Sequence, residues 1–165
     1  MLNDKPSDNI KAKILVVEDD ENMNDMICTF LKANKYDTIS SMNGDKVLEL
    51  ASTHRPDLII MDIMLPDTDG ITACDNLRKN ADTSAIPVIM LTAKNDIQSK
   101  LHSYSSGAKR FITKPFKYER LLEEIQKTLW QKNLTEELGV HHDKCGNSGD
   151  FGVIPSDMKK CSEPE

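Results

Sequence analysis

Short apolar runs alternate along the chain with longer stretches in which apolar residues recur every three or four positions. The runs have the length of strands, and the recurrence between them is typical of amphipathic helices. The five predicted strands are Lys13–Val17, Tyr36–Ser40, Asp57–Met61, Ile86–Leu91 and Lys109–Thr113. The second run is the most polar, so we expect it at an edge of the sheet.

A helical pattern follows each of the five predicted strands. The apolar positions that define the helices are Met23, Met26, Ile27, Phe30 and Leu31; Val47, Leu48 and Ala51; Ile71, Cys74 and Leu77; Ile97, Leu101 and Tyr104; and Leu121, Leu122, Ile125 and Leu129. Regular strand–helix alternation with continuous apolar strands predicts a parallel sheet covered by helices on both faces. Right-handed crossovers then limit the topology to a doubly wound α/β fold of five strands and five helices.

The alternating pattern defines one domain, which we place at residues 12–133, after an N-terminal extension of residues 1–11. Residues 134–165 are polar, with scattered glycines and prolines. This segment offers too little apolar surface to offset its ordering entropy, so we expect a disordered tail. Its one apolar island is Phe151–Pro155, which leaves open that the tail docks on the domain or on a partner. The tail residues His141, His142, Cys145 and Cys161 match no known zinc spacing.

Composition narrows the possible functions. The net charge of −6 argues against non-specific nucleic-acid binding, which relies on Lys and Arg to neutralise phosphates. No apolar run approaches the ~20 residues needed to cross a bilayer, so we expect no membrane association. The N-terminus lacks the apolar core of a signal peptide, which predicts a cytoplasmic protein. Cys28 and Cys74 fall within helical patterns and are expected to be buried, reduced thiols.

Polar residues that could take part in chemistry follow four of the predicted strands. Glu18 and Asp19 follow the first strand, Asp62 the third, Thr92 the fourth and Lys114 the fifth. Each residue has an ordinary explanation alone, as a helix cap or a solvated loop residue. Ligands of open α/β sheets bind outside the carboxyl ends of the strands. Because all of these polar residues are predicted at that edge, the sequence favours a functional site there.

The charges of these residues suggest the chemistry. Two carboxylates about 4 Å apart repel by about 4 kcal/mol at an effective dielectric constant near 20. Three carboxylates therefore need a cation, and an all-oxygen ligand set suits Mg²⁺. A metal, an ammonium group and a hydroxyl around one carboxylate describe a phosphoryl-transfer site. The carboxylate of Asp62 would be the nucleophile and would form an aspartyl phosphate.

Four segments together resemble the signature segments of one family. They read "ILVVEDDE", "LIIMDIMLPDTDG", "VIMLTA" and "FITKPF". In this order and spacing they are similar to the receiver (CheY-like) domain of bacterial two-component response regulators, over roughly Lys11 to Lys132. The resemblance implies the flavodoxin-like strand order 2-1-3-4-5.

The resemblance also implies a role for each matching residue. Asp62 matches the phospho-acceptor, Thr92 the hydroxyl that bonds the phosphoryl group, and Lys114 the phosphate-pairing lysine, whose bond to Pro115 is typically cis in this family. The implied Mg²⁺ ligands are Glu18, Asp19, Asp62 and the main-chain carbonyl of Met64, with Asp19 expected to bind directly. Thr92 and Phe111 match the switch residues. Glu18 replaces the commoner Asp, Asp20 is an extra carboxylate expected to face solvent, and Phe111 lacks a hydroxyl.

The implied function is signalling by a single-domain response regulator. Asp62 would take a phosphoryl group from a sensor histidine kinase or a histidine phosphotransfer protein, and the protein would catalyse only its own phosphorylation and dephosphorylation. The 32 residues after the domain are too few for a DNA-binding domain, so we expect no nucleic-acid partner and an output through protein binding. A phosphorelay intermediate that passes the group to another histidine is an alternative.

Two other interpretations of the acidic segment are weaker. "DTDGIT" (Asp67 to Thr72) resembles the signature of haloacid-dehalogenase-type phosphatases, but Pro66 and further loop residues separate Asp67 from the strand. An EF-hand fails because Leu65 stands where the first Ca²⁺-binding Asp would be.

The pair Lys109 and Arg110 bears on assembly. In receivers attached to winged-helix domains these positions are usually acidic and help to form a dimer across the fourth helix, fifth strand and fifth helix. A two-fold interface uses each residue twice, so a basic pair is costly there. We therefore expect a monomer, with this face free to bind an unknown downstream protein.

Overall fold

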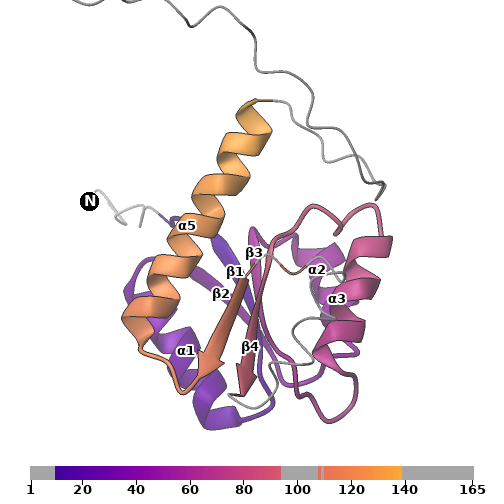
Figure 1. Ribbon diagram of the computed structural model, residues 1–165, viewed down its shortest axis with the longest axis vertical. Coiled ribbons are helices and arrows are strands. Elements are labelled where there is room, and N and C mark those ends of the chain that lie inside the picture. Colours follow the sequence, from indigo (N-terminus) through magenta and orange to yellow (C-terminus); the bar gives the residue numbers. More distant parts are fainter. Residues whose placement is uncertain (1–9, 94–107, 109, 139–165) are drawn as a thin grey trace, which may run out of the picture.

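The structure is a computed structural model that describes residues 10–93, 108 and 110–138 (Figure 1). Its strands are β1 (Lys13–Val17), β2 (Asp37–Ser41), β3 (Leu58–Asp62), β4 (Val88–Ala93) and β5 (Arg110–Lys114). Its helices are α1 (Glu21–Ala33), α2 (Val47–His54), α3 (Gly70–Lys79) and α5 (Tyr118–Glu137). The fourth helix, predicted around Ile97, Leu101 and Tyr104, lies outside the described residues.

The five strands form one parallel sheet in the order β2-β1-β3-β4-β5. The predicted doubly wound α/β fold and the 2-1-3-4-5 order are both confirmed, and the polar strand β2 lies at an edge as expected. Only β1 has the predicted bounds. The other strands begin and end one or two residues later, because the polar residues Asp62, Thr92 and Lys114 continue the strand pairing beyond the apolar runs.

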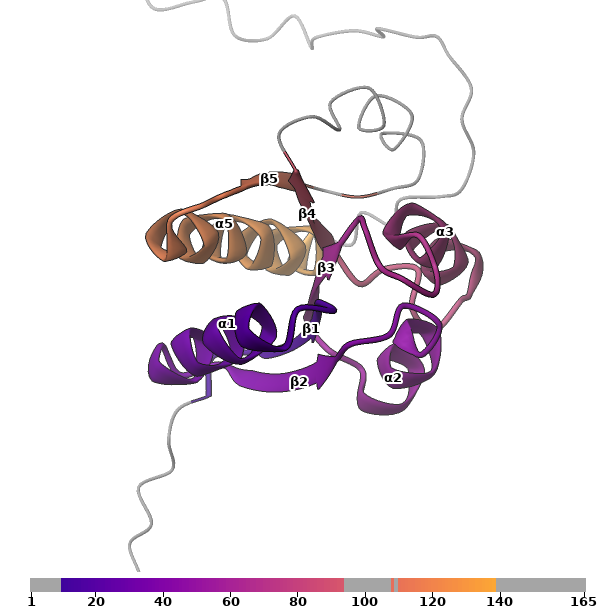
Figure 2. The same ribbon diagram turned by 90° about the horizontal axis from the view of Figure 1, so that it is seen from below.

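Alternate residues of the central strands bury opposite faces of the sheet, and each face has its own core. Figure 2 shows α1 and α5 on one face and α2 and α3 on the other. Leu15, Ile59 and Met90 pack toward α2 and α3. Ile14, Ile60 and Ile89 pack toward α1 and α5. The strands are therefore buried on both sides, which explains their continuous apolar sequences.

The buried face of α1 differs from the predicted one. Its buried residues are Asn24, Ile27, Cys28 and Leu31. Met26, which the spacing placed with the apolar positions, is 56% exposed. Each residue turns the helix by about 100°, so Met26 lies about 200° from Asn24 and Cys28. The prediction for Met26 was wrong because the inner face includes a polar residue, Asn24, that a purely apolar pattern passes over.

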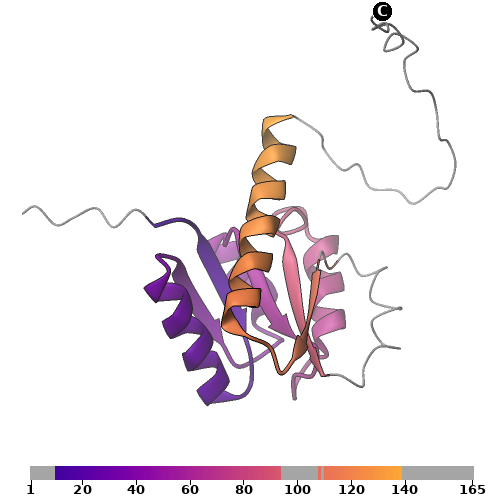
Figure 3. The same cartoon turned by 60° about the vertical axis from the view of Figure 1, so that its left-hand side comes forward.

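Helix α5 extends beyond the predicted end of the domain. It includes Leu134 to Glu137, which the sequence pattern assigned to the tail, and Figure 3 shows it projecting past the sheet. Just before this extension, Lys132 donates to Asp57 Oδ1 at 3.2 Å, and Asp57 Oδ2 accepts the backbone N–H of Lys13 at 2.9 Å. The rest of the predicted tail lies outside the described residues. None of the described helices combines the length and the apolar composition that a bilayer crossing requires.

Candidate functional site

Three carboxylates meet at the C-terminal edge of the sheet. Glu18 follows β1 directly, Asp19 is next in the chain, and Asp62 is the last residue of β3. One carboxylate oxygen of each lies within 4.8 Å of the others. Glu18 and Asp62 are 1% and 6% exposed, whereas Asp19 is exposed to solvent. The structure thus brings together the three acidic residues that the sequence predicted at this edge.

The ammonium group of Lys114, at the end of β5, lies between two of these carboxylates. Its Nζ donates to Glu18 Oε2 at 2.6 Å and to Asp62 Oδ2 at 2.5 Å. The Lys114–Pro115 peptide bond is cis, as the resemblance implied. Both carboxylates are buried, so their ion pairs with the lysine are far less screened than surface pairs.

The pKa directions reflect this crowding. Burial raises the pKa of Glu18, and the charge of Asp62 adds to the rise although the hydrogen bond from Lys114 opposes it. Burial alone would lower the pKa of Lys114. The hydrogen bonds and charges of Asp62 and Glu18 outweigh burial, so its pKa is raised and the ammonium form is favoured. One lysine therefore balances only part of the negative charge, and a divalent cation would balance the rest.

The start of α3 packs directly against the backbone of Asp62. A Cβ added at Gly70 would lie 2.9 Å from Ile63 Cα and closer still to the carbonyl oxygen of Asp62. The N–H of Gly70 donates to the carbonyl of Ile63 at 2.9 Å. The Asp62 side chain is held as well, because its Oδ1 accepts the N–H of Met64 at 2.9 Å. Gly70 is needed here for space rather than for an unusual backbone angle.

The two predicted switch residues lie on neighbouring strands. Thr92 is fully buried near the end of β4, and its hydroxyl donates to the carbonyl of Ala93 at 3.2 Å. Phe111 on β5 is half-buried and packs against the core between the sheet and α2 and α3. The Met64 side chain is 64% exposed. Thr92 thus lies at the carboxyl edge of the sheet with the charged residues, while Phe111 pairs with Met90, further from that edge.

Asp67, the first acid of the phosphatase-like segment, has a different role. Its carboxylate accepts the N–H of Gly44 at 3.1 Å and the N–H of Asp45 at 2.9 Å. These hydrogen bonds lower the pKa of Asp67 to about 2. Asp67 therefore joins the loop after β3 to the loop after β2, and it is not at the end of a strand as a nucleophile would be.

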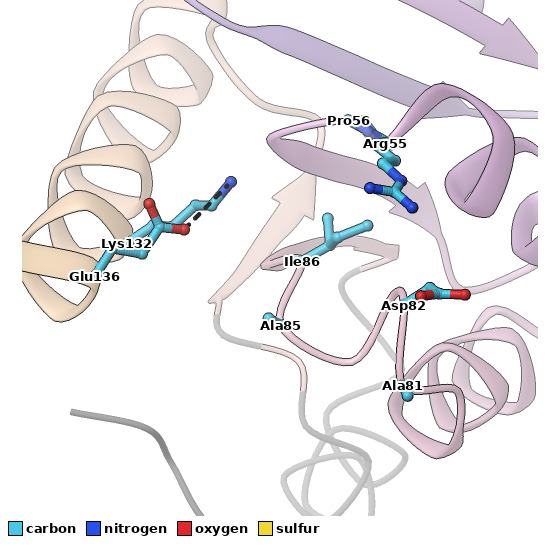
Figure 4. A pocket seen from close by; sticks show the side chains of 8 residues that line it. All are labelled: Arg55, Pro56, Ala81, Asp82, Ala85, Ile86, Lys132 and Glu136. Atoms are coloured by element: carbon cyan, nitrogen blue, oxygen red, sulfur yellow. Dashed lines mark ion pairs between the residues drawn. The ribbon is translucent and has the colours of Figure 1, made fainter. Parts of the chain in front are cut away.

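A separate cavity of about 350 Å³ lies near the N-terminal ends of the strands. Figure 4 shows Lys132 and Glu136 of α5 on one side and Arg55, Asp82 and Ile86 on the other. Lys132 is already paired with Asp57 and Glu136. None of the predicted site residues lines this cavity.

On the α5 side of β5, Arg110 pairs within the chain. Its Nη1 lies 2.8 Å from Glu124 Oε2 of α5, and its Nη2 donates to Gln131 Oε1 at 3.2 Å. Lys109 lies outside the described residues. The absence of the symmetric dimer stays a prediction.

Comparison with known proteins places this arrangement in a family. A model of the response regulator receiver domain matches residues 14–126, which include every predicted site residue. The chain belongs to this family. Receiver domains of this family are components of phosphorelay signalling.

Individual relatives agree with this assignment. The chain is 36% identical over 143 residues to the DNA-binding dual master transcriptional regulator RpaA of Synechocystis sp., covering 87% of this chain and 59% of that protein. It is 40% identical over 107 residues to the alkaline phosphatase synthesis transcriptional regulatory protein PhoP of Bacillus subtilis, covering 65% of this chain and 44% of that protein. The crystal structure of the chemotaxis response regulator CheY4 of Vibrio cholerae has a TM-score of 0.67 and 28% identity, covering 71% of this chain and 98% of that chain.

The chain spans about half of the length of RpaA and PhoP. RpaA is named as a DNA-binding regulator. The expectation that the protein has no nucleic-acid partner is therefore not supported.

Proposed function

We propose that the receiver domain takes a phosphoryl group from a phosphohistidine onto Asp62, with Mg²⁺ bound beside it. The observation that carries the proposal is the convergence of Glu18, Asp19 and Asp62 within 4.8 Å, with only Lys114 as a counter-charge among the described residues. Such an excess of negative charge is expensive to keep unless a cation binds.

The residues fit Mg²⁺ rather than a softer metal. All the side-chain donors are carboxylate oxygens, which hard divalent cations prefer. Glu18, Asp19, Asp62 and the main-chain carbonyl of Met64 would hold the ion. When bound, Mg²⁺ would neutralise the oxygens of the incoming phosphoryl group.

The reaction is a displacement at phosphorus. A carboxylate oxygen of Asp62 forms the new bond while the bond from phosphorus to the imidazole nitrogen breaks, and the electron pair returns to that nitrogen. Lys114 is close enough to Asp62 to move from its carboxylate to a phosphoryl oxygen. Within the described part of the chain, the hydroxyl of Thr92 donates to the neighbouring carbonyl of Ala93, and it can be redirected toward the phosphoryl group. Positioning and charge neutralisation would then supply the catalysis.

Signalling would follow from the switch pair. Thr92 in its redirected position would leave space that the ring of Phe111 can enter. Because Phe111 has no hydroxyl, this movement would depend on packing alone. The phosphorylated state would gain contacts that the free state lacks, which shifts a pre-existing equilibrium. We infer that the output is binding of a protein at the face that includes β5 and α5, by a monomeric cytoplasmic regulator. A relay that passes the group to another histidine uses the same chemistry.

Phosphorylation of Asp62 can be tested by intact mass. Incubation with acetyl phosphate and Mg²⁺ is expected to add one phosphoryl group to the wild type, and EDTA should abolish the addition. Asp62→Asn should take up none, and Asp67→Asn, which changes a neighbouring carboxylate outside the cluster, should be labelled normally. Undiminished labelling of Asp62→Asn would refute the proposal. Continued turnover of a phosphate ester would instead indicate a phosphatase.

A further inference from the structure

A carboxamide is buried directly behind the acidic residues. Asn24, in the first turns of α1, is 3% exposed. Its Nδ2 donates to the main-chain carbonyls of Glu18 and Ser41, each at 3.0 Å. Its Oδ1 accepts a hydrogen bond from Cys28 Sγ at 3.5 Å. Both ends of the amide are thus used within the fold, and the two carbonyls, which can only accept, require the Nδ2 end to face them.

These contacts hold the backbone of Glu18 at two points. The N–H of Glu18 donates to the carbonyl of Ser41 at 3.1 Å, and the carbonyl of Glu18 is held by Asn24, which binds the same Ser41 oxygen. Strand β1 ends at Val17, and the N–H of Glu18 still bonds to β2 one residue further on. The Asn24 amide therefore continues the alignment of β1 and β2 by one residue, to the first acid of the cluster.

The other end of the acidic loop is fixed by α1 as well. Asp20 caps the helix, and its Oδ1 accepts the N–H of Met23 at 2.9 Å. Asp19 lies between the residue that Asn24 holds and the residue that caps α1. The direction of the exposed Asp19 carboxylate thus depends on two attachments to the same helix.

We propose that Asn24 is a positioning residue that sets the Mg²⁺ affinity of the receiver domain. The inference rests on the proposed function, because it assigns Glu18 and Asp19 to the metal. Asn24 would not touch the ion. It would act through the backbone of Glu18, keeping two carboxylates near their bound positions before the metal arrives.

The expected size of the effect follows from the behaviour of residues behind metal ligands, whose loss typically weakens metal binding by about 10-fold to 100-fold. Without the amide, the carbonyls of Glu18 and Ser41 lose a donor in a water-poor place. The loop would then rearrange to find other partners. We expect Mg²⁺ affinity to fall by about tenfold, with a smaller loss in the phosphorylation rate at saturating Mg²⁺.

The test compares Asn24→Leu, which keeps the size of the side chain and removes both donors, with Ile27→Ala. Ile27 is fully buried on the same helix and packs in the core on that side of the sheet. Its truncation destabilises the domain without touching the acidic loop. Mg²⁺ binding is measured by titration calorimetry in the absence of any phosphodonor. The rate of labelling by acetyl phosphate is then measured as a function of Mg²⁺ concentration.

The expected result is a half-saturating Mg²⁺ concentration about tenfold higher for Asn24→Leu and unchanged within about twofold for Ile27→Ala. Equal Mg²⁺ dependence in the two variants would overturn the inference while leaving the proposed function intact. A wild type that binds no Mg²⁺ and takes up no phosphoryl group would overturn the proposed function itself. If Asn24→Leu does not fold, Asn24→Ser, which keeps one donor, is compared with Ile27→Ala by the same criterion.

Discussion

Replacement of Gly70 by alanine tests how tightly α3 is packed against the phosphorylation site. The substitution adds one methyl group at the first residue of α3. Helix propensity alone predicts a gain of up to about 1 kcal/mol, because alanine is the better helix former. The structure predicts the opposite sign, because the space for the methyl group is filled by backbone atoms of Asp62 and Ile63.

The magnitude follows from the distances. The new Cβ would lie 2.9 Å from Ile63 Cα and 3.1 Å from the carbonyl carbon of Asp62, and closer still to the oxygen of that carbonyl. Carbon atoms in contact prefer about 3.5–4.0 Å. Backbone must therefore move by more than half an ångström, and overpacking of this kind costs about 1–3 kcal/mol or more. We expect a net destabilisation of about 2 kcal/mol, which corresponds to a melting temperature lower by roughly 8 °C.

Thermal unfolding followed by circular dichroism measures this change, and Thr72→Ala is the matched control. Thr72 is exposed two residues further along α3, so alanine there gains helix propensity without a steric conflict. Gly70→Ala should also slow labelling by acetyl phosphate, because the backbone that moves carries Asp62. A Gly70→Ala protein as stable as Thr72→Ala would refute the packing argument.

Two further predictions concern the loops and the end of α5. At pH 7, Asp67→Ala should lower the urea midpoint, because the N–H groups of Gly44 and Asp45 lose their acceptor. The pKa of Asp67 is about 2 in the folded protein against an ordinary 3.8, so this contribution to stability is complete above about pH 4 and fades as the pH falls toward 2. A difference in urea midpoint between wild type and Asp67→Ala that is equal at about pH 5 and about pH 3 would contradict this reasoning. Truncation after Asn133 removes only exposed residues of α5 along with the rest of the tail, so the melting temperature and the labelling by acetyl phosphate should barely change. A large fall in either would show that the removed segment packs on the domain.

The strand pattern and the clustering of charge were predictable because both depend on local sequence. Continuous apolar strands fix a parallel sheet, and a parallel sheet brings every strand end to one edge. Asp62 and Lys114, 52 residues apart, could thus be placed together from the sequence alone. The exact strand ends were less predictable, since polar residues such as Thr92 still pair with a neighbouring strand.

The supporting residues were harder to find because their partners come from other elements. The spacing of Asn24 with Ile27 and Leu31 marks it as a core-facing residue, but its contact with Ser41 depends on how β2 aligns with β1. Gly70 is ordinary in sequence, and only the approach of α3 to Asp62 shows that a side chain would not fit. Such requirements arise from packing in three dimensions and leave no periodic signal.

The placement of the single tryptophan determines what an optical measurement would report. Trp130 is 65% exposed on α5, about 18 Å along the helix axis from Tyr118 near the charged edge of the sheet. Its fluorescence should therefore respond little when a metal ion binds to the carboxylates. It should respond strongly when a macromolecule covers α5 and withdraws the indole from water. The native chain thus carries an intrinsic reporter of what docks on α5 that is largely insensitive to events at the acidic cluster.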